Sequence, residues 1–320
     1  MVLFGPPPVP EKSKTCLGQC EDRGRIVGDI ISPVGALEDW EILEMYNFSL
    51  GKIKFYPDNP LVLIAGPCVI ESRDHCLFMA EKLKKLAQKY GVPLVFKSSF
   101  LKANRSSVDS FVGPGMEDGL KILNETRTQI DIPVISDIHS IEQVAPAAEV
   151  LDILQIPAFL CRQTSLIVAA ARTGRIVNIK KGQFLAPWDV RNIVNKVQSV
   201  GNNKLLITER GASFGYNNLV VDMRSLEIIK KLGAAVVFDA THSVQLPGGH
   251  GDSSGGQREF VNPLTRAALA VGVNAVFLEV HDKPEFAKCD GPNMITPEKL
   301  SSWLPLWLKI DQLVKTGKPN

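Results

Sequence analysis

Short runs of apolar, largely β-branched residues recur eight times along the chain, and this repeat constrains the fold more than any other feature. Most runs are followed by a segment in which apolar residues recur every three or four positions, as in an amphipathic helix. The predicted strands cover residues 61–66, 94–100, 133–138, 152–158, 176–182, 204–211, 235–241 and 275–280. Strands that are apolar nearly throughout and alternate with helices indicate parallel pairing with both faces of the sheet buried.

Eight such units over about 250 residues fit a (β/α)8 barrel, also called a TIM barrel. The alternative is a doubly wound open sheet, which would lead us to expect a G-x-G-x-x-G loop after the first strand. The sequence there reads GPCVIES, so we favour the barrel. We predict one barrel domain over residues 45–320, with a short β-hairpin at its start. The clearest helices are predicted at residues 76–91, 140–151, 187–201 and 260–272.

Residues 1–44 show little sustained periodicity of the strand or helix type, although residues 25–43 could carry a short strand or helix. They are rich in proline at the start, and Cys16 and Cys20 follow with the spacing of a pair. This pair could be half of a zinc site, but no matching cysteine or histidine pair follows nearby. We therefore expect a mobile N-terminal extension.

Composition argues against several classes of partner. The chain has 36 Lys and Arg against 34 Asp and Glu, a net charge of +2, which gives little support for binding to nucleic acid or to a membrane surface. No apolar run approaches the ~18–20 residues of a membrane span, and the first residues lack the features of a secretory signal. Six cysteines are too few for a disulfide scaffold. We expect a cytoplasmic protein.

Polar or ionisable residues follow each predicted strand. In a barrel the loops at the carboxyl ends of the strands build the active site. One such residue would usually be structural, but eight strands that end in this way indicate a site. In chain order these residues are Cys68, Lys97 with Lys102, Asp137 with His139, Gln155, Lys180 with Lys181, Glu209 with Arg210, Asp239 with His242, and Glu279 with His281.

The cations of this set point to anion binding. Arginine forks and lysine point charges suit phosphate oxygens. Residues 105–107 are expected to open a helix, whose free N–H groups would add to a phosphate site. Two separate clusters of cations suggest two phosphorylated ligands, or one ligand with two phosphates. The alternative interpretation is that the lysines lie on the solvated surface, which suits Lys84 and Lys85. The cations expected to converge on one mouth are Lys97, Lys102, Arg105, Lys180, Lys181 and Arg210.

A metal site is the second chemistry that these positions suggest. Cys68, His242, Glu279 and Asp290 follow strands one, seven and eight, which are neighbours in a closed barrel. One thiolate, one imidazole and two carboxylates suit zinc, ferrous iron, cobalt or manganese. The alternative is a buried structural cysteine and a core histidine, which is our interpretation of Cys76, Cys161 and His75.

Seven strings carry a family resemblance: LIAGPCVIES, FKSSFLKANRSS, GPGMEDGLKIL, IVNIKKGQF, ITERGASFGYNNLVVDMRSL, FDATHSVQLPGG and KCDGPNMI. From about residue 46 to the C-terminus the chain resembles the 3-deoxy-D-manno-octulosonate 8-phosphate synthases. The related 3-deoxy-D-arabino-heptulosonate 7-phosphate synthases carry a KPRTSP-like string where this chain has KANRSS. The resemblance therefore implies arabinose 5-phosphate, and not erythrose 4-phosphate, as the aldose.

The resemblance also implies roles for individual residues. Phe159 matches a position that reaches a neighbouring subunit's aldose site, which implies a homotetramer. Asn104, Arg105 and Ser106 match positions around the phosphate of arabinose 5-phosphate. The positions around phosphoenolpyruvate are Lys97, Lys102, Gln155, Lys180 and Arg210, with Asp137 as a further substrate-binding residue. Among these, Lys102, Lys180 and Arg210, together with His242, are the expected catalytic residues.

The family has a metal-dependent and a metal-independent class. The second has Asn in a GGMN string where this chain has Cys68 in AGPC. The resemblance thus implies the metal-dependent class, with a divalent metal ion on Cys68, His242, Glu279 and Asp290.

The implied reaction joins phosphoenolpyruvate, D-arabinose 5-phosphate and water into 3-deoxy-D-manno-octulosonate 8-phosphate and phosphate, for lipopolysaccharide or another cell-surface sugar. The glycine-rich residues 247–256 could form a lid or a merely mobile loop. Three alternatives stay open: a sugar-phosphate-binding regulator without turnover, a scaffolding subunit acting through residues 1–44, and the seven-carbon synthase.

Overall fold

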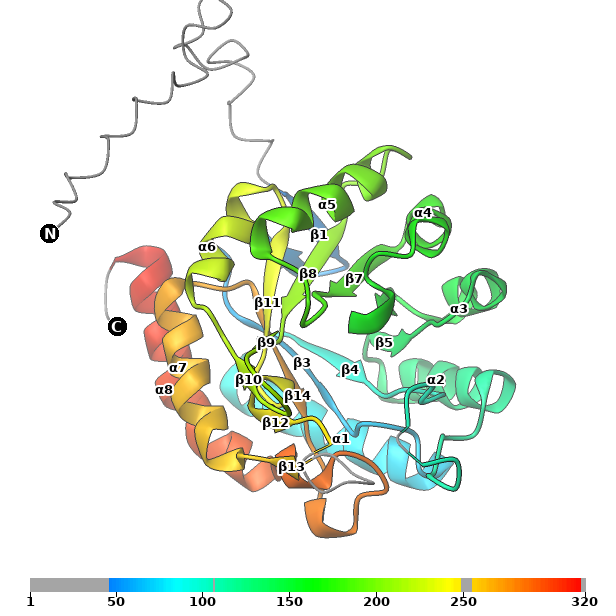
Figure 1. Ribbon diagram of the computed structural model, residues 1–320. Coiled ribbons are helices and arrows are strands. Elements are labelled where there is room, and N and C mark those ends of the chain that lie inside the picture. The colour runs from blue at the N-terminus through cyan, green and yellow to red at the C-terminus, as the bar shows by residue number, and fades with distance from the viewer. Residues whose placement is uncertain (1–45, 106, 249–254, 318–320) are drawn as a thin grey trace, which may run out of the picture. The chain divides into compact units, whose positions relative to one another are not determined.

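A closed barrel of eight parallel strands forms the centre of the computed structural model, which describes residues 46–105, 107–248 and 255–317 (Figure 1). The strands run around the barrel in the order β11-β14-β3-β4-β5-β6-β7-β8, and β8 pairs with β11 to close it. The predicted fold class is confirmed. The strands are β3 (Val62–Gly66), β4 (Leu94–Lys97), β5 (Val134–Asp137), β6 (Ile153–Ile156), β7 (Ile176–Lys180), β8 (Leu205–Glu209), β11 (Ala235–Asp239) and β14 (Ala275–Glu279).

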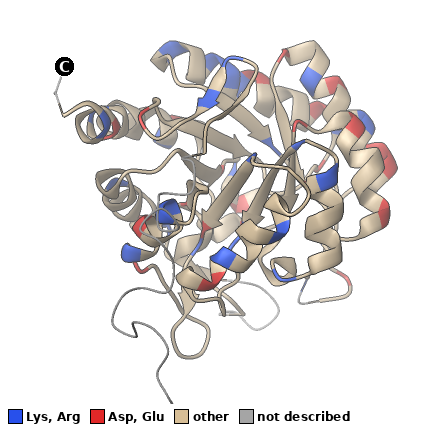
Figure 2. Ribbon diagram, turned by 90° about the horizontal axis from the view of Figure 1, so that it is seen from above, with Lys and Arg blue, Asp and Glu red and all other residues tan. Residues whose placement is uncertain are grey.

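An outer ring of helices covers the strands. The helix predicted at residues 76–91 begins earlier, at Arg73, because the Ser72 side chain accepts the N–H of His75 and caps it. Basic and acidic residues are interspersed on these outer helices (Figure 2). The helices are α1 (Arg73–Tyr90), α2 (Met116–Ile130), α3 (Val144–Val150), α4 (Thr164–Arg172), α5 (Val190–Gln198), α6 (Arg224–Lys231), α7 (Val261–Val271) and α8 (Pro297–Thr316).

The other three predicted helices each open as a short 3-10 turn that leads into the α-helix. These turns are η2 (Ile141–Gln143), η4 (Pro187–Asp189) and η6 (Arg258–Phe260). Pro146 is compatible with α3 because it lies in the first turn of that helix, where its missing N–H breaks no helical hydrogen bond.

The expectation of a helix opening at residues 105–107 is wrong for the residues that the structure describes. The chain there folds back on itself: the backbone N–H of Lys102 donates to the carbonyl of Val112 at 2.8 Å. Gly113 and Gly115 then take positive φ values of 99° and 86°, and helix α2 starts only at Met116. The segment is therefore a closed loop without helical N–H groups aimed at a ligand.

The predicted N-terminal hairpin is confirmed as β1 (Phe48–Leu50) and β2 (Ile53–Phe55). The ring of Phe48 stacks on that of Phe55 at 5.2 Å, and both pack with the inward residues of the barrel, such as Val62 and Ile64. The intervening Leu63 faces the other way, into the layer between barrel and helices. The hairpin thus closes the amino end of the barrel and leaves the carboxyl end for a site.

Two further hairpins rise at the carboxyl end. They are β9 (Ala212–Ser213) with β10 (Leu219–Val220), and β12 (Gln245–Leu246) with β13 (Gly255–Gly256). Most of the predicted lid, and the cysteine pair of the extension over residues 1–44, lie outside the described residues. In the part of the chain that the structure describes, no helix is long and apolar enough to cross a membrane.

Candidate active site

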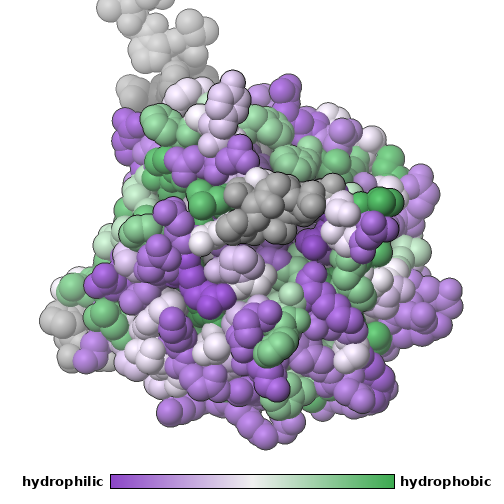
Figure 3. Space-filling model, turned by 60° about the horizontal axis from the view of Figure 1, so that its bottom comes forward, coloured by the Kyte–Doolittle hydropathy of each residue, from purple (hydrophilic) through white to green (hydrophobic). Residues whose placement is uncertain are grey.

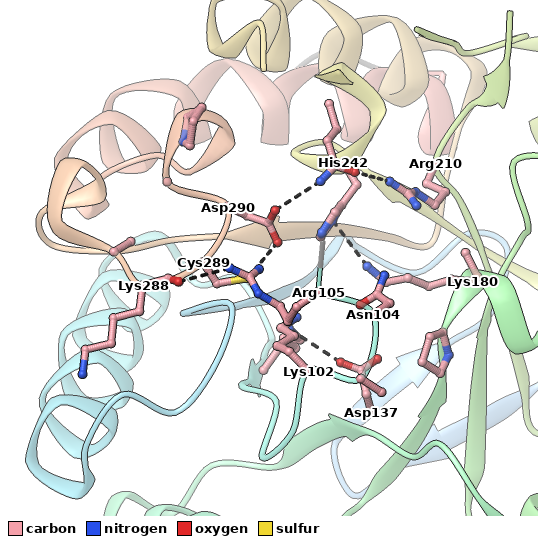
Figure 4. A pocket seen from close by; sticks show the side chains of 18 of the residues that line it. Lys102, Asn104, Arg105, Asp137, Lys180, Arg210, His242, Lys288, Cys289 and Asp290 are labelled. Atoms are coloured by element: carbon pink, nitrogen blue, oxygen red, sulfur yellow. Dashed lines mark hydrogen bonds and ion pairs between the residues drawn. The ribbon is translucent and has the colours of Figure 1, made fainter. Parts of the chain in front are cut away.

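A cavity of about 660 Å³ opens at the carboxyl end of the barrel, where the sequence predicted a site. Its wall is made by the ends of the strands and the loops that follow them (Figure 4). The structure brings most of the predicted site residues to this wall. They are Lys97, Lys102, Asn104, Arg105, Asp137, Phe159, Lys180, Arg210, His242 and Asp290.

The remaining predicted residues do not form part of the cavity lining among the residues described. Cys68, Gln155 and Glu279 are buried beside the lining residues and contact them directly. Ser106 lies outside the described residues. The expectation that Lys181 joins the other cations is wrong: its Nζ donates to the carbonyl of Leu185 at 3.1 Å, away from the cavity. Side chains alternate along a strand, so its neighbour Lys180 faces inward and Lys181 outward.

Each buried lysine of the site lies against a carboxylate. Lys97, only 1 % exposed, donates from Nζ to the carbonyl of Cys68 at 2.8 Å and lies 3.4 Å from Glu279 Oε1. Lys180 donates from Nζ to Asp239 Oδ2 at 2.7 Å. Burial of an isolated charge is costly, and these pairs compensate for it.

A chain of hydrogen bonds crosses the barrel beneath the cavity and holds Asp137. Gln155 Nε2 donates to Asp137 Oδ1 at 2.7 Å, and Asn178 Nδ2 donates to Gln155 Oε1 at 2.8 Å. Thr208 Oγ1 continues the chain to Asn178 Oδ1 at 2.7 Å. Gln155 therefore lies among residues that orient Asp137. Asn178 and Thr208 were not singled out from the sequence, because they stand inside the predicted strands, ahead of the charged residues that end them.

The positive charges of the site lower the pKa values of its carboxyl groups. Burial alone would raise the pKa of Asp137, but the charges of Lys97 and Lys102 hold it well below its ordinary value. His242 and Lys180 do the same for Asp239. Burial in turn lowers the pKa of Lys180. The carboxyl groups are therefore ionised at neutral pH.

Four predicted metal ligands lie close together at one side of the cavity. Ligand atoms of His242, Glu279 and Asp290 lie within 4.8 Å of one another, and Cys68 Sγ is 3.2 Å from Asp290 Oδ2. Glu279 Oε2 is buried without a hydrogen-bond partner in the described chain. His242 Nδ1 lies 3.0 Å from Asp239 Oδ1, which favours a proton on Nδ1 and a lone pair on Nε2, the atom that faces Glu279 Oε1 at 3.6 Å and could bind a metal. The residues present fit a divalent metal ion.

Cys289 and Gln245 also belong to this side of the cavity, and neither was predicted. Cys289 Sγ lies 3.0 Å from Cys68 Sγ and 3.1 Å from Asp290 Oδ2, and burial and this second thiol raise the pKa of Cys68. Its position next to Asp290 in KCDG was the signal that could have found it. Gln245 receives a hydrogen bond from Arg210 and donates one to Asp290 Oδ1 at 3.1 Å, so it links the anion-binding side to the metal-binding side.

A second group of possible ligands, Glu71, His75 and His281, is less suited to a metal. The backbone N–H of Lys283 donates to His281 Nδ1 at 2.9 Å, so the neutral ring carries its proton on Nε2, toward Glu71 Oε1. His75 lies 3.0 Å from Asp282 Oδ1 through its own Nε2. The two imidazoles thus lie against the carboxylates of Asp282 and Glu71, in keeping with the structural interpretation of His75.

Comparisons with known proteins agree with this geometry. The model of the DAHP synthetase I family matches residues 42–316. The 2-dehydro-3-deoxyphosphooctonate aldolase of Geotalea uraniireducens (strain Rf4) is 61 % identical over 267 residues, which cover 83 % of this chain and 98 % of that protein. The proteins of the same name from Trichlorobacter lovleyi and Geobacter sulfurreducens are each 60 % identical over the same shares.

The ion pairs of the site predict how stability depends on pH. The pKa of Asp239 is lower in the folded chain than in the unfolded one, so its contribution is present above the unfolded value of about 4 and is lost as pH falls below it. Asp239→Asn should cost about 3–5 kcal/mol near pH 7. We expect urea unfolding to show this as a difference in the free energy of unfolding between the wild type and Asp239→Asn. That difference should stay constant from pH 7 to about 5 and become smaller below about pH 4.

Asp74→Asn is the matched control, because the Asp74 side chain is 90 % exposed. It should change the free energy of unfolding by less than about 0.5 kcal/mol. A difference for Asp239→Asn that stays the same from pH 7 to pH 3 would contradict the ionised state assigned to this carboxyl group.

Proposed function

The chain belongs to the DAHP synthetase I family, and we propose that it condenses phosphoenolpyruvate with D-arabinose 5-phosphate and water to give 3-deoxy-D-manno-octulosonate 8-phosphate and inorganic phosphate. The observation that carries this proposal is the convergence of Lys97, Lys102, Arg105, Lys180 and Arg210 on one cavity. Both substrates are multiply charged anions, and such a cationic lining allows them to lie side by side. The product would serve lipopolysaccharide or another cell-surface sugar.

In this reaction the methylene carbon of phosphoenolpyruvate attacks the aldehyde carbon of the sugar, and water adds to the carbon that bears the phosphate oxygen. The resulting hemiketal phosphate then expels phosphate. Negative charge develops on oxygen during these steps, and Lys102, Lys180 and Arg210 would stabilise it from fixed positions. Arg210 Nε, buried and without a partner among the described residues, is a donor left for a substrate oxygen.

Asn104 and Arg105 would hold the phosphate of the sugar, with Ser106 as a third member. Both described residues line the cavity, and their segment, KANRSS, differs from the corresponding segment of the seven-carbon synthases. Arg105 Nη1 donates to Cys289 Sγ at 2.8 Å, while Arg105 Nε has no partner in the described chain. A phosphate group would give this buried donor a partner.

We also propose a divalent metal ion bound by Cys68, His242, Glu279 and Asp290. The unpaired Oε2 of Glu279 and the Nε2 of His242, which faces Glu279 Oε1 at 3.6 Å, support it, and the mixed donor set suits zinc, iron, cobalt or manganese. When bound, the metal would polarise the aldehyde or hold the attacking water. Asp239 would keep the imidazole of His242 oriented through Nδ1.

The proposed enzyme is a homotetramer in a reducing, cytoplasmic compartment. Phe159 lines the cavity although 57 % of it is exposed, and further aromatic side chains are exposed in the segments after β7 and β8. They are Phe184, Trp188, Phe214 and Tyr216. On the face shown in Figure 3, apolar residues occur in small groups between hydrophilic ones. The four described cysteines are free thiols, which supports the compartment. A monomeric mass in sedimentation equilibrium would contradict the tetramer.

Phosphate release tests the reaction. Purified protein should release phosphate from phosphoenolpyruvate when arabinose 5-phosphate is present, and far less with erythrose 4-phosphate. Lys180→Met should lower kcat by roughly 10²–10³-fold, because a buried cation is lost from the charged transition state. Equal release without any sugar, or turnover with erythrose 4-phosphate alone, would overturn the proposal. Binding of both substrates without turnover would instead indicate a sugar-phosphate-binding regulator.

Chelation tests the metal. Excess chelator should abolish turnover, and added zinc, manganese, cobalt or ferrous iron should restore it. Cys68→Ser should lower the metal content measured by mass spectrometry at least about 10-fold, since the thiolate is one of four ligands. Cys76→Ala, at a buried thiol that pairs with Thr126, should leave the content unchanged. Full turnover in chelator with no metal detected would show that Cys68 is a bystander.

A further inference from the structure

Lys181 and Glu209 form a buried ion pair directly behind the cavity wall. Lys181 Nζ lies 3.4 Å from Glu209 Oε2, and the two residues are 2 % and 1 % exposed. Neither is among the described residues that line the cavity, but their neighbours in sequence, Lys180 and Arg210, both are. The pair therefore joins the ends of β7 and β8 at the two points from which these cations enter the cavity.

Glu209 holds the backbone that follows Arg210. Its Oε1 accepts the N–H of Gly211 at 2.6 Å, and its Oε2 accepts the hydroxyl of Ser225, at the start of α6, at 2.8 Å. Gly211 has a φ of +91°, a conformation that a residue with a side chain rarely adopts. The carboxylate thus fixes the turn out of β8 and ties it to a rigid helix.

Lys181 holds the backbone that follows Lys180. Its Nζ donates to the carbonyl of Leu185 at 3.1 Å and lies 3.5 Å from that of Gly182. Its backbone N–H donates to the carbonyl of Thr208 on β8 at 2.8 Å. Lys181 therefore closes the turn out of β7 and connects it to the neighbouring strand.

Few hydrogen bonds hold the side chain of Arg210 in the described chain. Its guanidinium donates one hydrogen bond to a side chain, from Nη2 to Gln245 Oε1, and its buried Nε has no partner among the described residues. The direction of the guanidinium thus depends on its backbone as well as on Gln245 and the charges of Asp239, Asp290 and Glu279. For stability alone, a buried ion pair is often no better than an apolar pair of the same volume. The location of the Lys181–Glu209 pair, directly behind Lys180 and Arg210, favours a role in placing these two cations.

We propose that Lys181 and Glu209 are positioning residues that set the spacing and direction of Lys180 and Arg210, and thereby the affinity for phosphoenolpyruvate. This inference rests on the proposed function. It predicts that loss of the pair weakens binding of phosphoenolpyruvate while binding of the sugar phosphate, held by Asn104 and Arg105 on another loop, stays the same.

The test compares Lys181→Met, Glu209→Gln and the double variant with the wild type. Glu209→Gln keeps an oxygen for Gly211 and removes the charge. Each single variant should raise the KM for phosphoenolpyruvate about 10- to 100-fold, as expected for a misplacement of about 1 Å, with the KM for arabinose 5-phosphate unchanged. The double variant should recover part of the loss, because it leaves no unpaired charge. Titration calorimetry with phosphoenolpyruvate alone should give Kd values that rank the wild type and the three variants in the same order as their KM values.

Lys315→Met is the matched control. The Lys315 side chain is only 6 % exposed and pairs with Asp311, at 2.6 Å. It lies on α8, however, and Asp311 accepts the backbone N–H of Leu61 just before β3 begins. This variant should lower Tm without changing either KM. If Lys181→Met and Glu209→Gln likewise lower Tm and leave the KM for phosphoenolpyruvate unchanged, the positioning role is overturned. Absence of turnover in the wild type would overturn the proposed function itself, and this inference with it.

Discussion

The pairing of buried lysines with buried carboxylates at the carboxyl end of the barrel is the interaction on which the site depends. Apolar side chains fill the barrel interior next to the N-terminal hairpin, and the charged side chains that the barrel encloses lie at its carboxyl end. Lys97 lies against Glu279, and Lys180 against Asp239. Each buried charge is compensated by a partner of opposite sign. Removal of any one of these side chains would therefore leave an uncompensated buried charge.

Three buried polar atoms without a partner in the described chain lie at or beside the cavity, where ligands are proposed to bind: Arg105 Nε, Arg210 Nε and Glu279 Oε2. Similar atoms, such as Gln183 Oε1, occur elsewhere in the described chain. Unpaired buried polar atoms are costly, so these three support groups kept for substrates and a metal. Asp239 serves both needs, because it holds Lys180 and orients His242.

The two histidine groups show why residue type alone does not identify a metal site. His242 has its Nδ1 beside the carboxylate of Asp239, which favours a lone pair on the Nε2 that faces Glu279, whereas the neutral ring of His281 accepts a backbone N–H at Nδ1 and carries its proton on Nε2. The same side chain is thus a possible ligand in one place and carries a proton toward a carboxylate in the other. The group beside Nδ1, a carboxylate for His242 and a backbone N–H for His281, decides between them.

Much of the molecule was determined by the sequence itself. The period of the apolar runs specified eight parallel strands. A closed barrel gathers the carboxyl ends of its strands at one rim, so Lys180 and His242 had to lie near each other.

Other features depended on the tertiary structure. Lys180 and Lys181 look alike in the sequence, yet the pleat of β7 turns one into the cavity and the other toward Glu209. Cys289 and Gln245 join the site only because loops far apart in the chain meet there, and residues 105 and 107–115 form a loop because Lys102 bonds to Val112. Periodicity is a local property and can be found along the chain, whereas the direction of a side chain and the partner it meets are set by packing between distant segments.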